Sequence, residues 1–286
     1  MTRTFNPLTF ASCLLAISEY VHASFSLWEG STEDQGTALG LLPAQADIGK
    51  FPELERWVDQ DAEPLNKILQ ERGFSSRFDP IPPGRFGALS ILDLLVEWLE
   101  EGFRVAIENG DTTYPGFRLE GEGSGVTAVR GKGLGGVAAR IETKSGDVLW
   151  IHQGGPEPEN DFEAALLAET LLGALSRSGT RREANLIAPC VSLHESRQLD
   201  WAVGLEIPGK AVVQSGFQET RFRMNHRGAR AQVATGMVLE RSLPETREEI
   251  IVKGPFLLVI ERPGVETPVF SAYIGPESFI DPDDLD

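Results

Sequence analysis

Cysteine and histidine are scarce in this chain of 286 residues. The two cysteines, Cys13 and Cys190, form no Cys-x-x-Cys pair, and two cysteines do not make a disulfide framework. Metal ligands come at close, regular spacing, whereas the histidines here are scattered. We therefore expect no metal site and assign each histidine to a solvated or packed position. The four histidines are His22, His152, His194 and His226.

Basic residues are few relative to acidic ones. Lys and Arg number 26 against 43 Asp and Glu, which gives a formal net charge of −17. A surface of this charge repels phosphate backbones and anionic lipid. We therefore expect no nucleic acid among the partners of this protein.

Long apolar runs are missing as well. No stretch of 18 apolar residues exists, so we expect no membrane span. Residues 8–17 are apolar and follow a basic residue, but Pro7, Glu19 and Tyr20 do not suit a signal peptide, and a buried helix fits this stretch better. The compartment stays open between secreted and cytoplasmic.

The sequence also lacks the common catalytic motifs. Residues 121–125 read GEGSG, which does not fit the Gly-x-Ser-x-Gly turn of hydrolases. Residues 131–136 read GKGLGG, but no Lys-Ser/Thr pair follows as in a nucleotide-binding loop. No pair of carboxylates stands apart from the many solvated ones. We therefore predict no catalytic residue and no cofactor, and we infer a protein that acts by conformation and is not an enzyme.

What is present indicates a globular chain. Hydrophobic residues make up 41% and charged residues 24% of the sequence, enough for one large core or two small ones. Residues 8–28 are predicted as one helix that starts after Pro7. Residues 52–72 are predicted as an amphipathic helical segment that is broken near Pro64 and ended by Gly73.

The later part of the chain alternates strands and turns. Residues 137–142 and 147–152 are two apolar segments joined by a short polar turn, which is typical of a hairpin. Residues 162–175 are predicted as a helix with an Asn-Asp pair as its cap. Residues 88–103 carry acidic side chains at helix-like intervals in an apolar segment, so their periodicity indicates a helix.

Residues 225–242, NHRGARAQVATGMVLERS, carry an alternating pattern after Gly228. In an extended strand, successive side chains point to opposite faces. One face would then be small and mostly apolar, and such a strand can slide between two existing strands because its inward side chains need little room. A helix stays the alternative, since many of these residues are good helix formers. The residues with small side chains on this face are Ala229, Ala231, Val233 and Thr235.

Three segments resemble the serpin family in their order and spacing. Residues 213–235 resemble the strand and hinge that precede the reactive-centre loop of that family. Residues 254–260 (GPFLLVI) and 268–275 (PVFSAYIG) resemble its C-terminal hairpin, in which a Pro-Phe pair opens one strand. The resemblance implies an α+β fold with mixed and antiparallel sheets, surrounding helices and an exposed reactive-centre loop.

The resemblance is closest over residues 103–280. It implies a single serpin-like domain over residues 1–286, with a helical N-terminal part at residues 1–102 and a sheet-rich part at residues 103–280. The chain is divergent and shorter than the members of that family, with the shortfall on the N-terminal side. For residues 88–103 the family would place a long central strand, which conflicts with the helical periodicity, and both interpretations stay open.

The resemblance implies an inhibitor of a serine-type endopeptidase, with that protease as partner and the inhibitor as a monomer. Cleavage of the loop would let the hinge insert as a new strand and trap the protease, in suicide inhibition from a metastable state. The usual loop spacing puts the reactive bond after Ser242, and one residue less puts it after Arg241. The bond between Arg241 and Ser242 suits a trypsin-like protease, whose specificity pocket ends in an Asp. Leu239 and Leu243 are further candidates, for chymotrypsin- or elastase-like proteases. The hinge residues implied are Gly228, Ala229, Ala231, Val233 and Thr235.

Departures from the family pattern keep two other classes open. His226 stands where the family usually has Glu, and Arg230 and Gln232 replace smaller or acidic residues. By alternation, Arg230 and Gln232 share the outward face, so they need not block insertion. The first alternative is a non-inhibitory protein of serpin fold that serves as a binding or storage module. The second is a small α/β hydrolase.

Overall fold

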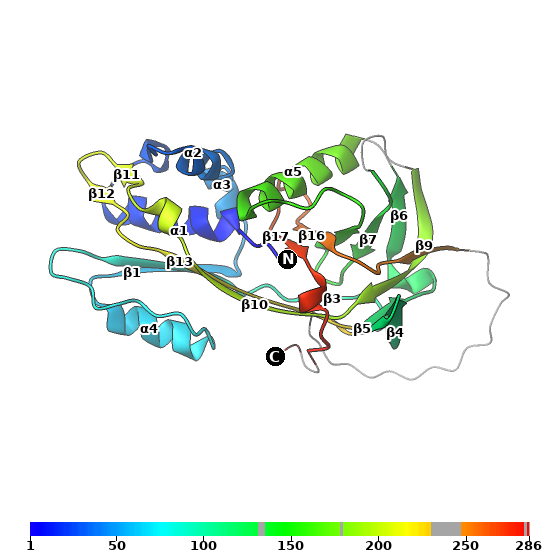
Figure 1. Cartoon of the computed structure of the whole chain (residues 1–286). Coiled ribbons are helices and arrows are strands. Elements are labelled where there is room, and N and C mark those ends of the chain that lie inside the picture. Colours follow the sequence, from blue (N-terminus) through cyan, green and yellow to red (C-terminus); the bar gives the residue numbers. More distant parts are fainter. Residues whose placement is uncertain (131–134, 178–179, 230–246, 283–284, 286) are drawn as a thin grey trace. The chain divides into compact units, whose positions relative to one another are not determined.

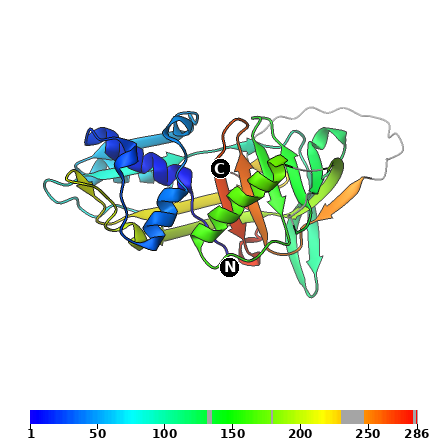
Figure 2. The same ribbon diagram turned by 90° about the horizontal axis from the view of Figure 1, so that it is seen from above.

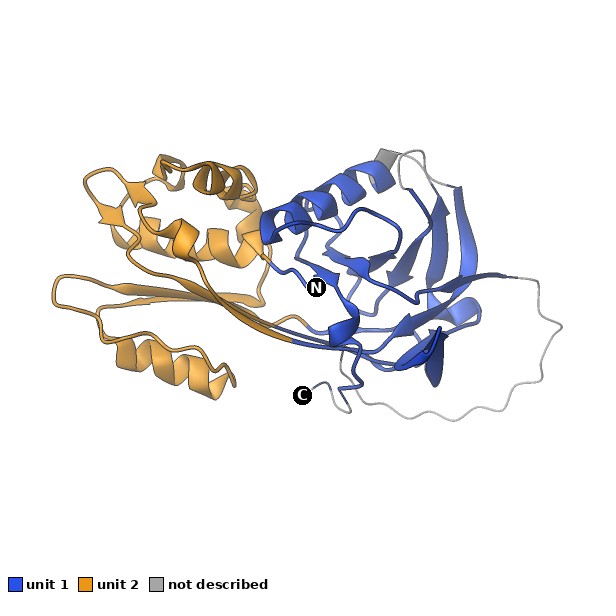
Figure 3. Ribbon diagram, in the orientation of Figure 1, with its two compact units in different colours: residues 1–4, 95–193, 221–286 blue, residues 5–94, 194–220 orange. Residues whose placement is uncertain are grey.

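The computed structural model describes residues 1–130, 135–177, 180–229, 247–282 and 285 of the chain (Figure 1). These residues divide into two compact units (Figure 3). Unit 1 contains residues 1–4, 95–193 and 221–286, and unit 2 contains residues 5–94 and 194–220. The prediction of a single domain over the whole chain stays a prediction.

Unit 2 begins with a buried helix. Helix α1 (Pro7–Tyr20) starts at Asn6, whose side-chain oxygen accepts a hydrogen bond from the backbone N–H of Thr9 at 3.0 Å. Proline suits the first helical position because the N–H it lacks would have no partner there. The helix ends at Tyr20 rather than continuing to residue 28. The other helices of this unit are η1 (Phe25–Leu27), α2 (Glu33–Gly40), α3 (Gln45–Ile48), α4 (Ala62–Glu71) and η3 (Asp200–Ala202).

Residues 52–72 contain a strand before the helix, which corrects the helical prediction for the first half of this segment. Strand β1 (Leu54–Asp59) pairs antiparallel with β2 (Gly87–Leu92). Pro64 lies in the first turn of α4, where proline is tolerated, so it marks the beginning of the helix and does not break it. Gly73 follows the helix with a φ of 80°, which confirms the predicted end.

Residues 88–92 are a strand, so the helical periodicity of residues 88–103 is misleading there. Alternate residues of β2 are buried, because one face packs on Leu65 and Leu69 of α4. Leu89 and Ile91 supply this buried face. The two-stranded sheet lies between α1 and α4 (Figure 1). A second small pair consists of β11 (Glu206–Ile207) and β12 (Ala211–Val212).

Unit 1 is built on a nine-stranded sheet with the order β17-β16-β8-β7-β6-β9-β5-β4, with β15 beside β9. Neighbours pair antiparallel except β15 and β9, which are parallel. The hairpins predicted at residues 137–152 and 254–275 are both confirmed. The strands are β4 (Phe103–Asn109), β5 (Thr112–Leu119), β6 (Val126–Arg130), β7 (Ala138–Glu142), β8 (Val148–His152), β9 (Thr180–Pro189), β15 (Glu248–Ile251), β16 (Phe256–Glu261) and β17 (Phe270–Ile274).

Helix α5 (Asp161–Arg177) covers one face of this sheet and runs across its strands (Figure 2). Its start is capped by Asn160, whose side-chain oxygen accepts the N–H of Glu163 at 2.9 Å, as predicted. Alanines and leucines of α5 pack against Trp150 of β8 and Val259 of β16. Short helices η2 (Glu122–Ser124) and η4 (Pro276–Ser278) complete the unit.

Four further strands surround the predicted hinge. Strand β10 (Val191–Gln198) pairs with β13 (Phe217–Met224) in a two-stranded sheet. Strand β3 (Val96–Glu97) pairs antiparallel with β14 (Gly228–Ala229). The chain therefore passes from strand β13 into β14 at the point where the hinge is predicted to begin.

Candidate functional site

The turn between β13 and β14 reverses the chain over four residues, Asn225 to Gly228, which we call the hinge turn. The backbone N–H of each end residue donates to the carbonyl of the other, both at 3.3 Å. The side-chain oxygen of Asn225 also accepts the N–H of Arg227 at 2.9 Å. Asn at the first and Gly at the fourth position are the residues that a tight β-turn favours. The local sequence therefore accounts for the reversal.

Gly228 is held against β3 by backbone contacts. It pairs with Glu97, and Ala229 pairs with Val96. Gly228 has a φ of 112°, a region that L side chains rarely adopt. A Cβ at this position would lie 2.8 Å from the backbone nitrogen of Trp98 and 2.9 Å from the carbonyl oxygen of Val96. Both conformation and space therefore require glycine at the start of the hinge.

Trp98, the residue directly after β3, anchors the hinge turn. Its side chain is 1% exposed, and its indole N–H donates to the carbonyl oxygen of Asn225 at 2.9 Å. The ring stacks on Phe117 of β5 with 5.9 Å between the centroids. On the other side of the turn, the N–H of Gly102 donates to the carbonyl oxygen of His226 at 2.7 Å. Sequence reasoning missed Trp98, because its partner lies 127 residues further along the chain.

His226 is buried at the hinge turn, with 8% of its surface exposed. Its Nε2 lies 3.5 Å from a carboxylate oxygen of Glu101. Burial lowers the pKa of His226 below its ordinary value of 6.5. The guanidinium groups of Arg104 and Arg227 lower it further, while Glu101 and Asp281 raise it in part. The ring is therefore neutral at neutral pH.

The chain re-enters the described part of unit 1 at Arg247, just before β15. Arg247 pairs with Glu183 of β9 at 2.9 Å. Arg118 of β5 pairs with Glu249 at 3.0 Å, and Arg130 of β6 pairs with Glu248. Strand β15 is thus joined to three neighbouring strands by charge as well as by its parallel ladder with β9.

The predicted site residues fall into two groups. Gly228 and Ala229 lie in β14, beside β3. The remaining hinge residues and the predicted reactive bond lie outside the described residues. These are Ala231, Val233, Thr235, Arg241 and Ser242.

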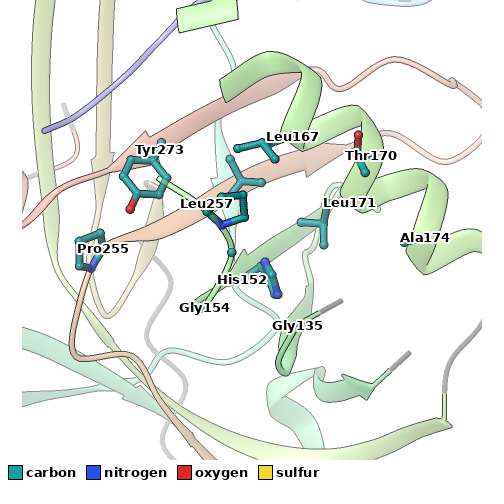
Figure 4. Close-up of a pocket in the computed structure, with 12 residues that line it drawn as sticks. Gly135, His152, Gly154, Leu167, Thr170, Leu171, Ala174, Pro255, Leu257 and Tyr273 are labelled. Atoms are coloured by element: carbon teal, nitrogen blue, oxygen red, sulfur yellow. The ribbon is translucent and has the colours of Figure 1, made fainter. Parts of the chain in front are cut away.

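A pocket of about 170 Å³ lies between α5 and the sheet of unit 1 (Figure 4). Helix α5 contributes apolar side chains, and β16 and β17 contribute Leu257 and Tyr273. Burial raises the pKa of the Tyr273 phenol, and the nearby carboxylates of Glu157 and Glu277 raise it further, so this polar group stays neutral. The lining is mostly apolar, with a few polar groups. It includes His152, Leu167, Thr170, Leu171, Ala174 and Pro255.

In the part of the chain that the structure describes, no group of three or more His, Cys, Asp and Glu residues is arranged to hold a metal ion. No helix within the described ranges has the length and apolar character needed to cross a membrane.

Comparison with known proteins identifies the fold of this chain. No family model and no curated protein matches the sequence. Solved structures do match over 96% of the chain. The mouse protein Z-dependent protease inhibitor has a TM-score of 0.61 at 12% identity, with 90% of that chain covered. Serpin48 of the insect Tenebrio molitor, a highly specific serpin, has a TM-score of 0.60 at 13% identity, with 91% covered. Human thyroxine-binding globulin in complex with thyroxine has a TM-score of 0.59 at 11% identity, also with 91% covered.

The chain is therefore a divergent protein of serpin fold, and the predicted α+β class is confirmed. Its structural neighbours include protease inhibitors as well as a protein that carries a small ligand. At 11–13% identity, these similarities show the fold of the chain.

Proposed function

We propose that the protein inhibits a serine-type endopeptidase of trypsin-like specificity by inserting its cleaved reactive-centre loop as a strand. The observation that supports this most directly is the hinge turn. It sends the chain back antiparallel to β13, and the first two hinge residues pair with β3. A strand that has begun in this register can lengthen by adding backbone hydrogen bonds one residue at a time.

The mechanism has three steps. A protease attacks the bond between Arg241 and Ser242 and becomes acylated. Cleavage frees the hinge from its tether, and residues 229–235 enter as a strand with their small side chains inward. Before cleavage, a kinetic barrier keeps the protein from reaching this more stable arrangement. The free energy released on insertion moves the covalently attached protease and distorts its active site.

Incubation with trypsin tests this proposal. A complex that survives denaturing gel electrophoresis is expected, and Arg241→Ala should abolish it because the arginine that fits the specificity pocket is lost. Ala231→Arg should be cut without forming the complex, because its charge would be buried unpaired. Arg230→Ala, on the outward face, is the matched control and should inhibit like the natural sequence. Cleavage of the natural sequence without any complex would overturn the proposal.

The pocket beneath α5 favours a second candidate function, the binding of a small apolar ligand. A pocket of this size accommodates a group of about one aromatic ring, and the few polar groups in its wall could orient such a ligand. Titration with phenol, followed by calorimetry, checks it. Ala174→Phe should fill the pocket and abolish binding. Leu166→Phe, at an exposed position of the same helix, should leave binding unchanged. Equal binding by both variants would exclude this site.

A further inference from the structure

His226 occupies a position from which it controls the start of the hinge. Its carbonyl oxygen accepts the Gly102 N–H at 2.7 Å, and the preceding carbonyl, of Asn225, accepts the Trp98 indole N–H at 2.9 Å. Two residues later, Gly228 pairs with Glu97. Movement of the His226 ring out of its buried site would therefore strain the three contacts that hold the hinge turn, which are the hydrogen bonds from Gly102 and Trp98 and the pairing of Gly228 with β3.

The charges that face His226 come from three segments. Arg227 lies in the hinge turn itself, Glu101 and Arg104 lie at the entry and in the first residues of β4, and Asp281 lies in the C-terminal segment. Both carboxylates are already engaged, since Glu101 lies 3.5 Å from Arg227 and Asp281 lies 3.2 Å from Arg104. The Nδ1 atom of His226 is buried and has no hydrogen-bond partner among the described residues. A proton on this ring would thus enter a buried site whose two carboxylates are already matched by two arginines, so no surplus anion compensates its charge.

We propose that His226 is a proton-operated latch on the hinge. As the neutral imidazole it packs beneath the hinge turn and holds β14 on β3. As the imidazolium it leaves the buried site for water and releases Gly228 and Ala229 from β3. The consequence for inhibition rests on the proposed function: acid would loosen the hinge and change the rate at which the loop inserts.

The pH window follows from linkage. The pKa of His226 is lowered in the closed hinge and returns toward 6.5 once the ring is exposed. The open state therefore binds more protons, and the latch is strongest above pH 6.5. It weakens as the pH falls from 6.5 toward the lowered pKa. At pH 5.5 the open population should exceed that at pH 7.5, by at most about tenfold.

Amide hydrogen exchange of the full chain tests the latch directly. The reporters are the N–H groups of Gly102 and Gly228, which donate to carbonyls of the hinge turn. After correction for intrinsic rates, their protection should fall between pH 7.5 and 5.5, by at most about tenfold. In His226→Gln the protection should not change with pH. His22→Gln, at an exposed histidine, is the matched control and should respond like the natural sequence.

Two outcomes would overturn the latch: protection that does not fall with acid in the natural sequence, or an equal fall in His226→Gln. If His226→Gln does not fold, Glu101→Gln provides a second test. Loss of this carboxylate should lower the pKa of His226 further and enlarge the acid response, so a smaller response contradicts the latch. Exchange requires no protease. If protection falls with acid but trypsin forms no stable complex, only the proposed function is rejected. If trypsin forms the complex but protection does not fall with acid, only the latch is rejected.

Discussion

Gly228 is the residue at which conformation and space restrict the hinge most tightly. A left-handed backbone costs a residue with a side chain about 1–3 kcal/mol, and at Gly228 the new Cβ would also meet backbone atoms of β3 that cannot rotate away. Gly228→Ala should therefore open the β3–β14 pair and raise the exchange rate of the Gly102 N–H by more than tenfold.

Gly146→Ala separates the two effects. Gly146 also has a positive φ, 85°, but a Cβ there would meet no atom within 4 Å. Its substitution should lower the free energy of unfolding by the backbone strain alone and leave the exchange of Gly102 unchanged. Normal protection of Gly102 in Gly228→Ala would show that β14 does not depend on this glycine.

At the scale of single residues, the sequence predicts what is local. Asn225 and Gly228 lie three residues apart, and their types alone favour a tight turn. Trp98 could not be found in this way, because its acceptor is a backbone carbonyl far along the chain. The sequence marks His226 as a departure from the family pattern, but the charges that act on it come from residues 101, 104 and 281, which the local pattern does not bring together.

Helices and strands could likewise be predicted where their causes are local in sequence, and not where they depend on distant segments. The hairpins β7–β8 and β16–β17 could be predicted, since each turn and its two strands are contiguous in sequence, over residues 138–152 and 256–274. Strands β1 and β2 could not, because Leu54 pairs with Leu92 across an intervening helix. In a helix, Ile91 and Leu95 would share a face, yet Ile91 is 4% exposed and Leu95 is 43% exposed. Packing on α4 buries every second residue of β2, although the acidic residues of the segment 88–103 repeat at helical intervals.

A pair of substitutions tests this assignment of β2. Ile91→Ala removes a side chain packed among the leucines of α4 and should cost about 2–5 kcal/mol of unfolding free energy. Leu92→Ala, on the opposite and half-buried face, should cost clearly less. Urea unfolding at neutral pH measures both. Equal losses, or a larger loss at Leu92, would contradict the register.

At the scale of the whole molecule, the fold leaves the function undecided between two kinds of action. Structures of serpin fold that share only 11–13% of residues with this chain include a protease inhibitor and a protein that binds thyroxine. The fold must therefore depend on the pattern of buried positions, which tolerates replacement of most side chains. The choice between inhibition and binding depends on the segment after Gly228, and on whether it can join β3 as a full strand.

Thermal melting before and after a single cut at Arg241–Ser242 makes that choice. Insertion would add roughly ten net backbone hydrogen bonds at about 1 kcal/mol each. At about 2 °C per kcal/mol for a chain of this size, the melting temperature should rise by on the order of 20 °C. Ala231→Arg, cut in the same way, should show no such rise, because a charged side chain on the inward face prevents the strand from entering. A natural sequence that melts at the same temperature before and after the cut has no strand to insert, which would contradict inhibition by insertion and leave ligand binding to be tested at the pocket beneath α5.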